Sequence, residues 1–238
     1  MSVAFVTGGS RGIGAEMVRQ LAASGWSVAF CYLKDDDAAQ KVANDTGALK
    51  FKVDVADEKA VTAAIEEAAK QLGDIDLLVN NAAISFVGLF NDITTDQWSR
   101  MLNVNLNGVI NATRAALPKM IANKRGRIVN ISSVWGQVGA SCEVHYSTTK
   151  AAVIGFTKAL AKEVGPSGIT VNCIAPGVIA TDMNSHLSAE DMADLAEQTP
   201  LCRIGKARDV AKCLLYLASE DGGFITGQVL TVDGGFSV

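Results

Sequence analysis

The sequence predicts an α/β fold, a single domain over residues 1–238 with one doubly wound parallel sheet of about seven strands and helices on both faces. Strand and helix patterns alternate along the whole chain, which is typical of parallel sheets joined by crossover helices. Hydrophobic residues make up 49% of the chain and charged residues 19%, a composition that suits a sheet buried on both faces. No linker, repeat or low-complexity segment divides the chain.

The first unit is a strand, a glycine-rich turn and a helix. Ser2–Val6 is a short apolar run that leads directly into Thr7–Gly14, where the glycines follow the spacing Gly-x-x-x-Gly-x-Gly. We expect Gly8 to allow the tight turn, Gly12 to let the backbone approach a pyrophosphate, and Gly14 to let helix and strand pack closely. This context predicts a phosphate-binding site. The helix that follows carries an apolar face and ends near Gly25.

Further strands and helices follow in alternation. Short apolar runs predict strands at Val28–Tyr32, Leu49–Val53, Ile75–Asn80, Arg127–Ser132, Thr170–Ala175 and Val229–Val232. Helical patterns lie near 36–45, 57–72, 95–122, 144–164, 188–197 and 207–219. The prolines agree with this assignment, because Pro118 lies near a helix end and Pro166, Pro176 and Pro200 lie in predicted loops.

Polar and small residues follow four of these strands, at the edge where parallel sheets bind ligands. Asp54-Val55 follows the third strand, and its carboxylate could accept a hydrogen bond from an adenine amine. Asn80–Ala83 follows the fourth, with two amides before two small residues that admit a ligand to the backbone. Ser132-Ser133 follows the fifth strand, and Pro176–Thr181 follows the sixth. One such segment is typical of a turn, but four at one edge indicate a binding site.

Tyr146 and Lys150 are the candidate proton-transfer pair. Their spacing of four places both side chains on one face of a helix. A phenol is protonated at neutral pH because its unperturbed pKa is about 10. A neighbouring ammonium favours the phenolate, so we expect Lys150 to lower the pKa of Tyr146 and make it a usable acid or base.

The motifs together resemble those of the short-chain dehydrogenase/reductase family: Thr7-Gly8-x-x-x-Gly12-x-Gly14, Asn80-Asn81-Ala82, Ser133, Tyr146-x-x-x-Lys150 and Pro176-Gly177. The resemblance runs from the first strand to Val232-Asp233-Gly234-Gly235 and implies a Rossmann-type fold. No single motif is specific for this family, but the combination of motifs is. One departure is Ala83, where the family usually has glycine, and one methyl group is a small change for cofactor binding.

The resemblance implies an enzyme that reduces a ketone to a secondary alcohol with a nicotinamide cofactor. It assigns catalysis to Asn105, Ser133, Tyr146 and Lys150, with Tyr146 as the proton donor and Ser133 as a donor to the substrate oxygen. Asn105 would hold a water that links Lys150 to solvent, although its amide could equally cap an irregularity in its helix. The implied cofactor contacts are Gly8, Ser10, Arg11, Gly12, Ile13, Gly14, Tyr32, Asp54, Val55, Asn81, Ala82, Tyr146, Lys150, Pro176, Gly177, Ile179 and Thr181.

The end of the second strand favours NADPH over NADH. An acid at that position would bind the ribose hydroxyls of NAD and repel a 2′-phosphate. The strand ends at Tyr32 and the first acid is Asp35, whereas Arg11 and Lys34 bring positive charge to this region. We therefore expect NADP(H) as the cofactor.

The substrate is less well defined. The chain resembles bacterial 3-oxoacyl-acyl-carrier-protein and acetoacetyl-CoA reductases, which implies a 3-oxoacyl thioester and a place in fatty acid metabolism. Carrier-protein reductases often have a basic residue where Ser167 stands, although Lys124 and Arg125 remain as a basic pair. Asp182–Lys206 corresponds to the family's substrate lid and contains Met183, His186, Leu187, Met192 and Leu195.

Two other functions compete with this interpretation. Ser132–Val144 is similar to a segment of reductases that act on the 5-aminopentanone modification of elongation factor P, where Glu143 could face an amine; Trp135 and Cys142 could also simply pack under the loop. A non-catalytic NADP(H)-binding protein is the third possibility. Such proteins typically lose the tyrosine or the lysine, and this chain keeps both.

Composition limits the partners. A net charge of −4 argues against nucleic acid or an anionic membrane as the main partner. The chain begins at the first strand, with no apparent signal peptide and no apolar run long enough to span a bilayer. Five unpaired cysteines indicate reduced thiols in a cytoplasmic protein, and the histidine and cysteine spacings predict no metal site. The family resemblance implies a homotetramer formed through the helices near 95–122 and 144–164 and the last strand.

Overall fold

Seven parallel strands form the central sheet of the computed structural model, which describes residues 2–184 and 187–237. Their order is β3-β2-β1-β4-β5-β6-β9. The chain steps outward from β1 to β3 and then returns to place β4 on the other side of β1, which creates the switch point where doubly wound sheets bind ligands. The predicted α/β fold is confirmed. The strands are β1 (Val3–Thr7), β2 (Ser27–Tyr32), β3 (Leu49–Lys52), β4 (Leu77–Asn80), β5 (Gly126–Ile131), β6 (Ile169–Pro176) and β9 (Val229–Val232).

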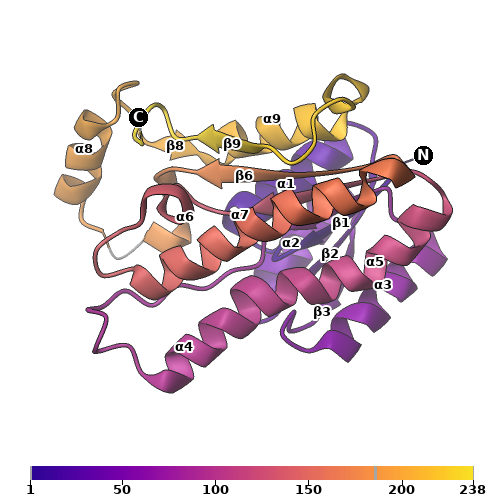
Figure 1. Ribbon diagram of the computed structural model, residues 1–238, viewed down its shortest axis with the longest axis horizontal. Coiled ribbons are helices and arrows are strands. Elements are labelled where there is room, and N and C mark those ends of the chain that lie inside the picture. Colours follow the sequence, from indigo (N-terminus) through magenta and orange to yellow (C-terminus); the bar gives the residue numbers. More distant parts are fainter. Residues whose placement is uncertain (1, 185–186, 238) are drawn as a thin grey trace.

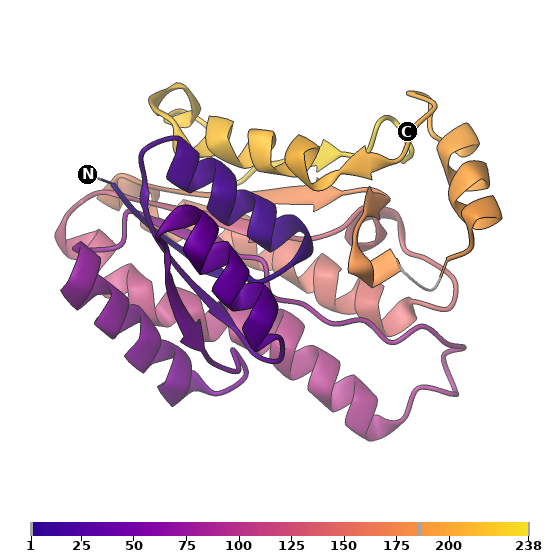
Figure 2. The same cartoon turned by 180° about the vertical axis from the view of Figure 1, so that it is seen from behind.

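Helices cover both faces of this sheet. Figure 1 shows the face covered by α3 (Glu58–Leu72), α4 (Thr95–Leu102), α5 (Gly108–Ala122) and α7 (Val144–Val164). Figure 2 shows the opposite face, with α1 (Gly12–Ala23), α2 (Asp36–Thr46) and α9 (Ala207–Ala218). Successive strand residues point to opposite faces, so Phe5 belongs to the core under α3 and α5, whereas Val6 belongs to the core under α1 and α9.

The structure differs from the sequence prediction in four places. The predicted helix 95–122 is interrupted by a π-helix over Asn103–Asn107, between α4 and α5. The short helix α6 (Trp135–Val138) and the two-residue pair β7 (Ile179–Ala180) and β8 (Gly205–Lys206) were not predicted, because such elements are too short for a periodic pattern. Pro176 ends β6 rather than lying in a loop. Helix α8, in the segment expected to form the lid, spans Ala189–Gln198.

All five cysteines have free thiols. Within residues 2–184 and 187–237, no helix is long and apolar enough to cross a membrane. In the same ranges, no group of three or more His, Cys, Asp or Glu side chains is arranged to hold a metal ion.

Candidate active site

The end of β4 holds the glycine-rich loop in place. The Thr7 hydroxyl accepts hydrogen bonds from the backbone N–H groups of Asn81 and Ala82, at 2.9 and 3.0 Å. The Asn81 side-chain amide donates to the carbonyls of Thr7 and Gly8, at 3.0 and 3.1 Å. Gly8 and Gly12 have φ angles of +69° and +55°, which glycine adopts without strain. The loop is therefore fixed before any ligand arrives.

One of its glycines lies where a side chain would collide with the loop, and another faces the segment after β6. A Cβ atom on Gly14 would lie 2.1 Å from the carbonyl oxygen of Gly8, so only glycine allows α1 to start this close to the loop. Gly12 faces Thr181 from the segment after β6, whose Cγ2 would lie 3.5 Å from an added Cβ. The loop, the start of α1 and Thr181 thus lie together, and the N-terminus of a helix after such a loop is where the pyrophosphate of a dinucleotide would bind.

Ser133, Tyr146 and Lys150 are all buried at the carboxyl edge of the sheet. The Lys150 Nζ atom donates to the carbonyl of Ile131 at 2.8 Å and lies 5.6 Å from the centroid of the Tyr146 ring. The Ser132 hydroxyl donates to the carbonyl of Lys150 at 2.8 Å, which fixes the start of α7 against the end of β5. The ammonium has two further N–H groups that could bind ribose hydroxyls.

Burial determines the protonation of this pair. It raises the pKa of Tyr146 well above the ordinary value for a phenol; the negative charge of Glu143 raises it further, and a hydrogen bond with Ser133 offsets part of the rise. Burial also lowers the pKa of Lys150 to about 8. The expectation that the pKa of Tyr146 is lowered is wrong here, because burial and Glu143 raise this pKa and only the hydrogen bond with Ser133 lowers it in part. Tyr146 therefore holds its proton at neutral pH.

Asn105 lies in the π-helix and joins two neighbouring segments. Its side-chain oxygen accepts from the backbone N–H of Ile84, and its amide donates to the carbonyl of Ile84, both at 2.9 Å. The amide also donates to the Thr149 hydroxyl at 3.2 Å, and Thr149 donates to the carbonyl of Tyr146 at 2.8 Å. Asn105 thus lies at a helix irregularity, but its side chain bonds Ile84 and Thr149 and does not cap the π-helix. A water held by Asn105 remains a prediction.

Asp54 and Val55 follow β3, on the β1–β3 side of the switch point where the adenine half of a dinucleotide would lie. The Asp54 carboxylate accepts from the backbone N–H of Ala56 at 3.0 Å and forms a 2.8 Å ion pair with Arg100 on α4. The carbonyl of Val55 accepts from the Asn111 amide at 3.1 Å. Both residues are therefore fixed by partners from distant segments.

The end of β2 carries a network that the sequence did not indicate. The Tyr32 hydroxyl donates to Asp36 at 2.8 Å, and Asp36 forms a 2.6 Å ion pair with Lys52. Asp35 caps α2 by accepting from the backbone N–H of Ala38. Two of the three acids after β2, Asp35 and Asp36, are thus engaged, while Asp37, Arg11 and Lys34 are exposed. Tyr32 faces Asp36, so its predicted cofactor contact would come from the ring and not from a free hydroxyl.

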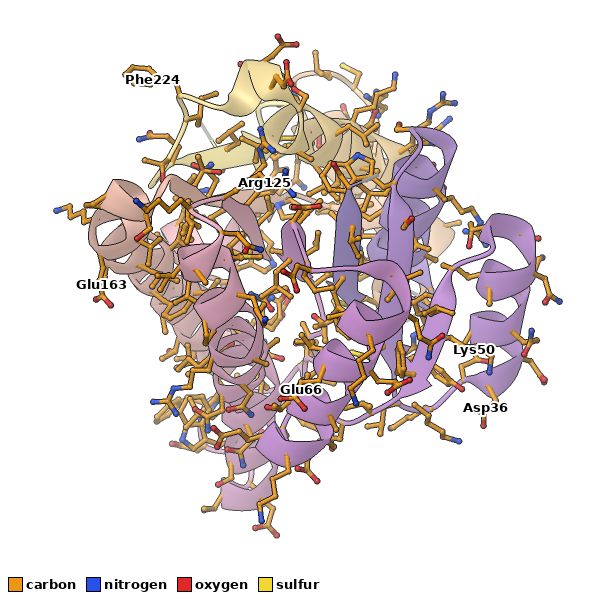
Figure 3. All side chains as sticks on the ribbon, turned by 90° about the vertical axis from the view of Figure 1, so that its right-hand side faces the viewer. Asp36, Lys50, Glu66, Arg125, Glu163 and Phe224 are labelled. Carbon is orange, nitrogen blue, oxygen red and sulfur yellow. The ribbon has the colours of Figure 1, made fainter. Side chains whose placement is uncertain are left out.

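The predicted substrate side consists of several segments. Glu143, just before α7, accepts a hydrogen bond from Ser85 at 3.1 Å. The Trp135 ring packs edge-on against Phe236 near the C-terminus, with centroids 5.7 Å apart. Part of the lid is described, but His186 lies outside the described residues. Arg125, labelled in Figure 3, forms an ion pair with Asp76. These two residues lie just before β5 and β4, at the amino edge of the sheet, whereas Tyr146 lies at the carboxyl edge.

Arg100, Ser85 and Thr149 contact the predicted site residues, yet the sequence did not single them out. Ser85 lies 58 positions from Glu143, and Thr149 lies 44 positions from Asn105. A lone arginine, serine or threonine has no local pattern that indicates such a partner. Only the fold brings these pairs together.

Known proteins match this chain over nearly all of its length. The family model described as enoyl-(acyl carrier protein) reductase matches residues 8–237. A short-chain dehydrogenase/reductase variant from Serratia marcescens has a structure with a TM-score of 0.93 and 38% identity, covering 100% of this chain and 98% of that one. The chain belongs to the short-chain dehydrogenase/reductase family.

Other members of this family are equally similar. The acetoacetyl-CoA reductase of Shinella zoogloeoides is 43% identical over 98% of this chain and 97% of its own length. A 3-oxoacyl-[acyl-carrier-protein] reductase of Staphylococcus aureus is 40% identical over 98% of this chain and 96% of its own. A blue fluorescent protein from a metagenomic library, in complex with NADPH, has a TM-score of 0.93 and 39% identity and covers 100% and 98% of the two chains. The predicted family is confirmed.

Proposed function

We propose that this short-chain dehydrogenase/reductase reduces the keto group of a 3-oxoacyl thioester, carried by CoA or an acyl-carrier protein, with NADPH. The observation that carries the proposal is the buried group of Ser133, Tyr146 and Lys150 at the carboxyl edge of the sheet, the edge where β1 leads into the glycine-rich loop. The similar reductases named for acetoacetyl-CoA and 3-oxoacyl carrier protein support the substrate class. The NADPH complex of a similar structure supports the cofactor.

Bound NADPH would supply the hydride for the carbonyl carbon, and the residues of the protein would place the substrate and handle one proton. Ser133 donates a hydrogen bond to the substrate oxygen, on which negative charge develops. Tyr146 then gives its proton to that oxygen, so one C–H and one O–H bond form and a secondary alcohol results. The raised pKa of Tyr146 keeps this proton available at neutral pH. Lys150 holds the ribose and stabilises the phenolate that Tyr146 becomes.

Preference for NADPH follows from the charges near β2. Asp36 is paired with Lys52 and Asp35 caps α2, so both carboxylates already have partners, whereas Asp37 is exposed. Arg11 and Lys34 are exposed cations in the same region and would attract a 2′-phosphate. The ion pair of Asp36 reduces the repulsion that a free acid would exert.

Initial rates of cofactor oxidation with acetoacetyl-CoA test the proposal. We expect kcat/KM to be at least about tenfold higher with NADPH than with NADH, which corresponds to one charge-assisted contact to the 2′-phosphate. Equal or better use of NADH would contradict the cofactor assignment. No turnover with acetoacetyl-CoA or a 3-oxoacyl carrier protein would contradict the thioester assignment.

Glu143 favours a second candidate substrate, a ketone that carries an amine. Its carboxylate is bonded to Ser85, and no basic side chain among the described residues forms an ion pair with it. It lies near enough to Tyr146 to raise the pKa of that phenol. A cationic substrate would pair with Glu143, as the modified lysine of elongation factor P could. Faster turnover of 5-aminopentan-2-one than of pentan-2-one, lost in Glu143→Gln, would favour this candidate.

We further propose that the protein works in the cytoplasm. The five free thiols are those of a protein kept in a reducing compartment. Fractionation of cells that express the tagged protein would test this placement.

A further inference from the structure

α4, the π-helix and α5 follow one another without a gap and form one long helix. This long helix contacts Asp54-Val55, the segment expected to bind the adenine, at three points. Arg100 Nη1 lies 2.8 Å from Asp54 Oδ2. The Asn111 amide donates to the carbonyl of Val55, and a Cβ atom on Gly108 would lie only 2.6 Å from Val55 Cγ2. One contact fixes the backbone of Val55, one packs against its side chain, and one holds the carboxylate of Asp54.

The Asp54 carboxylate has two partners but can still accept further hydrogen bonds. Its Oδ1 accepts from the N–H of Ala56, and its Oδ2 pairs with Arg100. An ionised carboxylate has about four acceptor sites, so it can take further donors. The side chain is 31% exposed, which leaves the carboxylate accessible from solvent. It is an anchored acceptor in the place where the adenine half would lie.

We propose that Arg100 is a positioning residue for the cofactor. It orients Asp54 to accept the adenine amine and neutralises a carboxylate that would otherwise repel the phosphates of NADPH. The inference rests on the proposed function, because it requires an adenine-containing cofactor. A guanidinium suits this task because its planar fork stays charged and holds the carboxylate in one orientation.

Arg114 on α5 provides a matched control. It is also an arginine of the long helix paired with an acid, Glu58 at the start of α3, but the distance is 3.9 Å and the side chains are 70% and 60% exposed. Exposed pairs of that kind contribute little. Arg100 and Asp54 are closer, at 2.8 Å, and their side chains are 37% and 31% exposed. Replacing each arginine by methionine removes the same charge and keeps much of the packing.

The test measures dissociation constants of three ligands by titration calorimetry. NADPH and 2′,5′-ADP contain the adenine, whereas reduced nicotinamide mononucleotide lacks it. We expect Arg100→Met to raise the dissociation constants of NADPH and 2′,5′-ADP by about tenfold, because Asp54 loses a charge-assisted partner. The mononucleotide should bind Arg100→Met as it binds the wild type, and Arg114→Met should bind all three ligands like the wild type. In turnover, the loss in Arg100→Met should fall on KM for NADPH and not on kcat.

A double variant tests whether the effect of Arg100 on binding depends on Asp54. Asp54→Asn removes the negative charge that Arg100 would neutralise. In this background we expect Arg100→Met to raise the dissociation constant of 2′,5′-ADP by less than about twofold. Wild-type affinity of Arg100→Met for 2′,5′-ADP would overturn the inference, as would an equal loss for the mononucleotide or in Arg114→Met. Failure of the wild type to bind NADPH or 2′,5′-ADP would instead overturn the proposed cofactor, and the inference with it.

Discussion

Tyr146 and Lys150 show how burial sets the charges that reduction requires. A phenol with a raised pKa is a weak acid in isolation, yet it keeps its proton until negative charge develops on the substrate oxygen. Lys150, with a pKa lowered to about 8, is mostly protonated at neutral pH, but its pKa lies close to that pH. The sequence predicted the pair from its spacing. It could not predict the pKa values, because these depend on burial and on Glu143.

The role of Tyr146 as proton donor is tested by removing its hydroxyl group. In Tyr146→Phe we expect kcat to fall by about 10²–10⁴-fold, because general acid catalysis by a side chain contributes about that much. The dissociation constant of NADPH should change little, since the ring stays in place. Steady-state rates and NADPH fluorescence measure the two quantities. Tyr216→Phe, at a half-exposed position on α9, should retain the wild-type rate. A near-normal kcat in Tyr146→Phe would refute the assignment.

The Lys150 charge predicts the alkaline limb of the pH profile. The ammonium stabilises the phenolate only while it is protonated, and its pKa of about 8 means that it becomes neutral as the pH rises through 8. We therefore expect kcat/KM for ketone reduction to be constant near neutral pH and to fall above about pH 8. Tyr146, with its raised pKa, stays protonated over this range and does not cause the fall. A profile that is flat to pH 10 would contradict this prediction.

At the scale of elements, periodicity predicted what is long and regular. The seven strands and the longer helices appear where apolar runs and helical patterns indicated them, within about two residues, the usual uncertainty of such boundaries. The pattern over 95–122 continues through Asn103–Asn107, because a π-helix adds a residue to a turn without interrupting the apolar face. The sequence predicted Asp54 and Asn105, whose motifs are local. It missed Arg100 and Thr149, which act through tertiary contacts.

The link between the π-helix and α7 depends on the hydroxyl of Thr149. Thr149→Val keeps the shape but leaves the buried Asn105 amide without one acceptor, which costs about 1–3 kcal/mol. For a chain of this size we expect the melting temperature to fall by about 2–4 °C per kcal/mol. We also expect a lower kcat, because Thr149 bonds to Tyr146 and precedes Lys150. Thr148→Val is the matched control, since Thr148 is exposed and bonds only within its own helix. Equal melting temperatures for the two variants would contradict this role.

At the scale of the whole molecule, the sheet ends in two edge strands, β3 and β9, and several apolar residues are exposed. β9 is an edge strand, and an unpaired edge can add a strand or pack against another chain. Phe224 precedes β9 in the chain, is fully exposed and projects from the surface in Figure 3. Leu89 and Phe90, in the loop before α4, and Val144, at the start of α7, are also exposed. The chain thus presents apolar surface both near β9 and near the long helices.

These two surfaces support the expected homotetramer, because two different contacts are needed to join four copies with two-fold symmetry. Light scattering should give a mass of about 100 kDa, four times the 24.9 kDa chain. Phe224→Asp would place a charge in the contact near β9, so we expect dimers of about 50 kDa held by the long helices. Phe224→Leu keeps an apolar side chain and should remain tetrameric. A wild type that is monomeric at micromolar concentration would refute the tetramer, whereas a tetrameric Phe224→Asp would place the second contact away from β9.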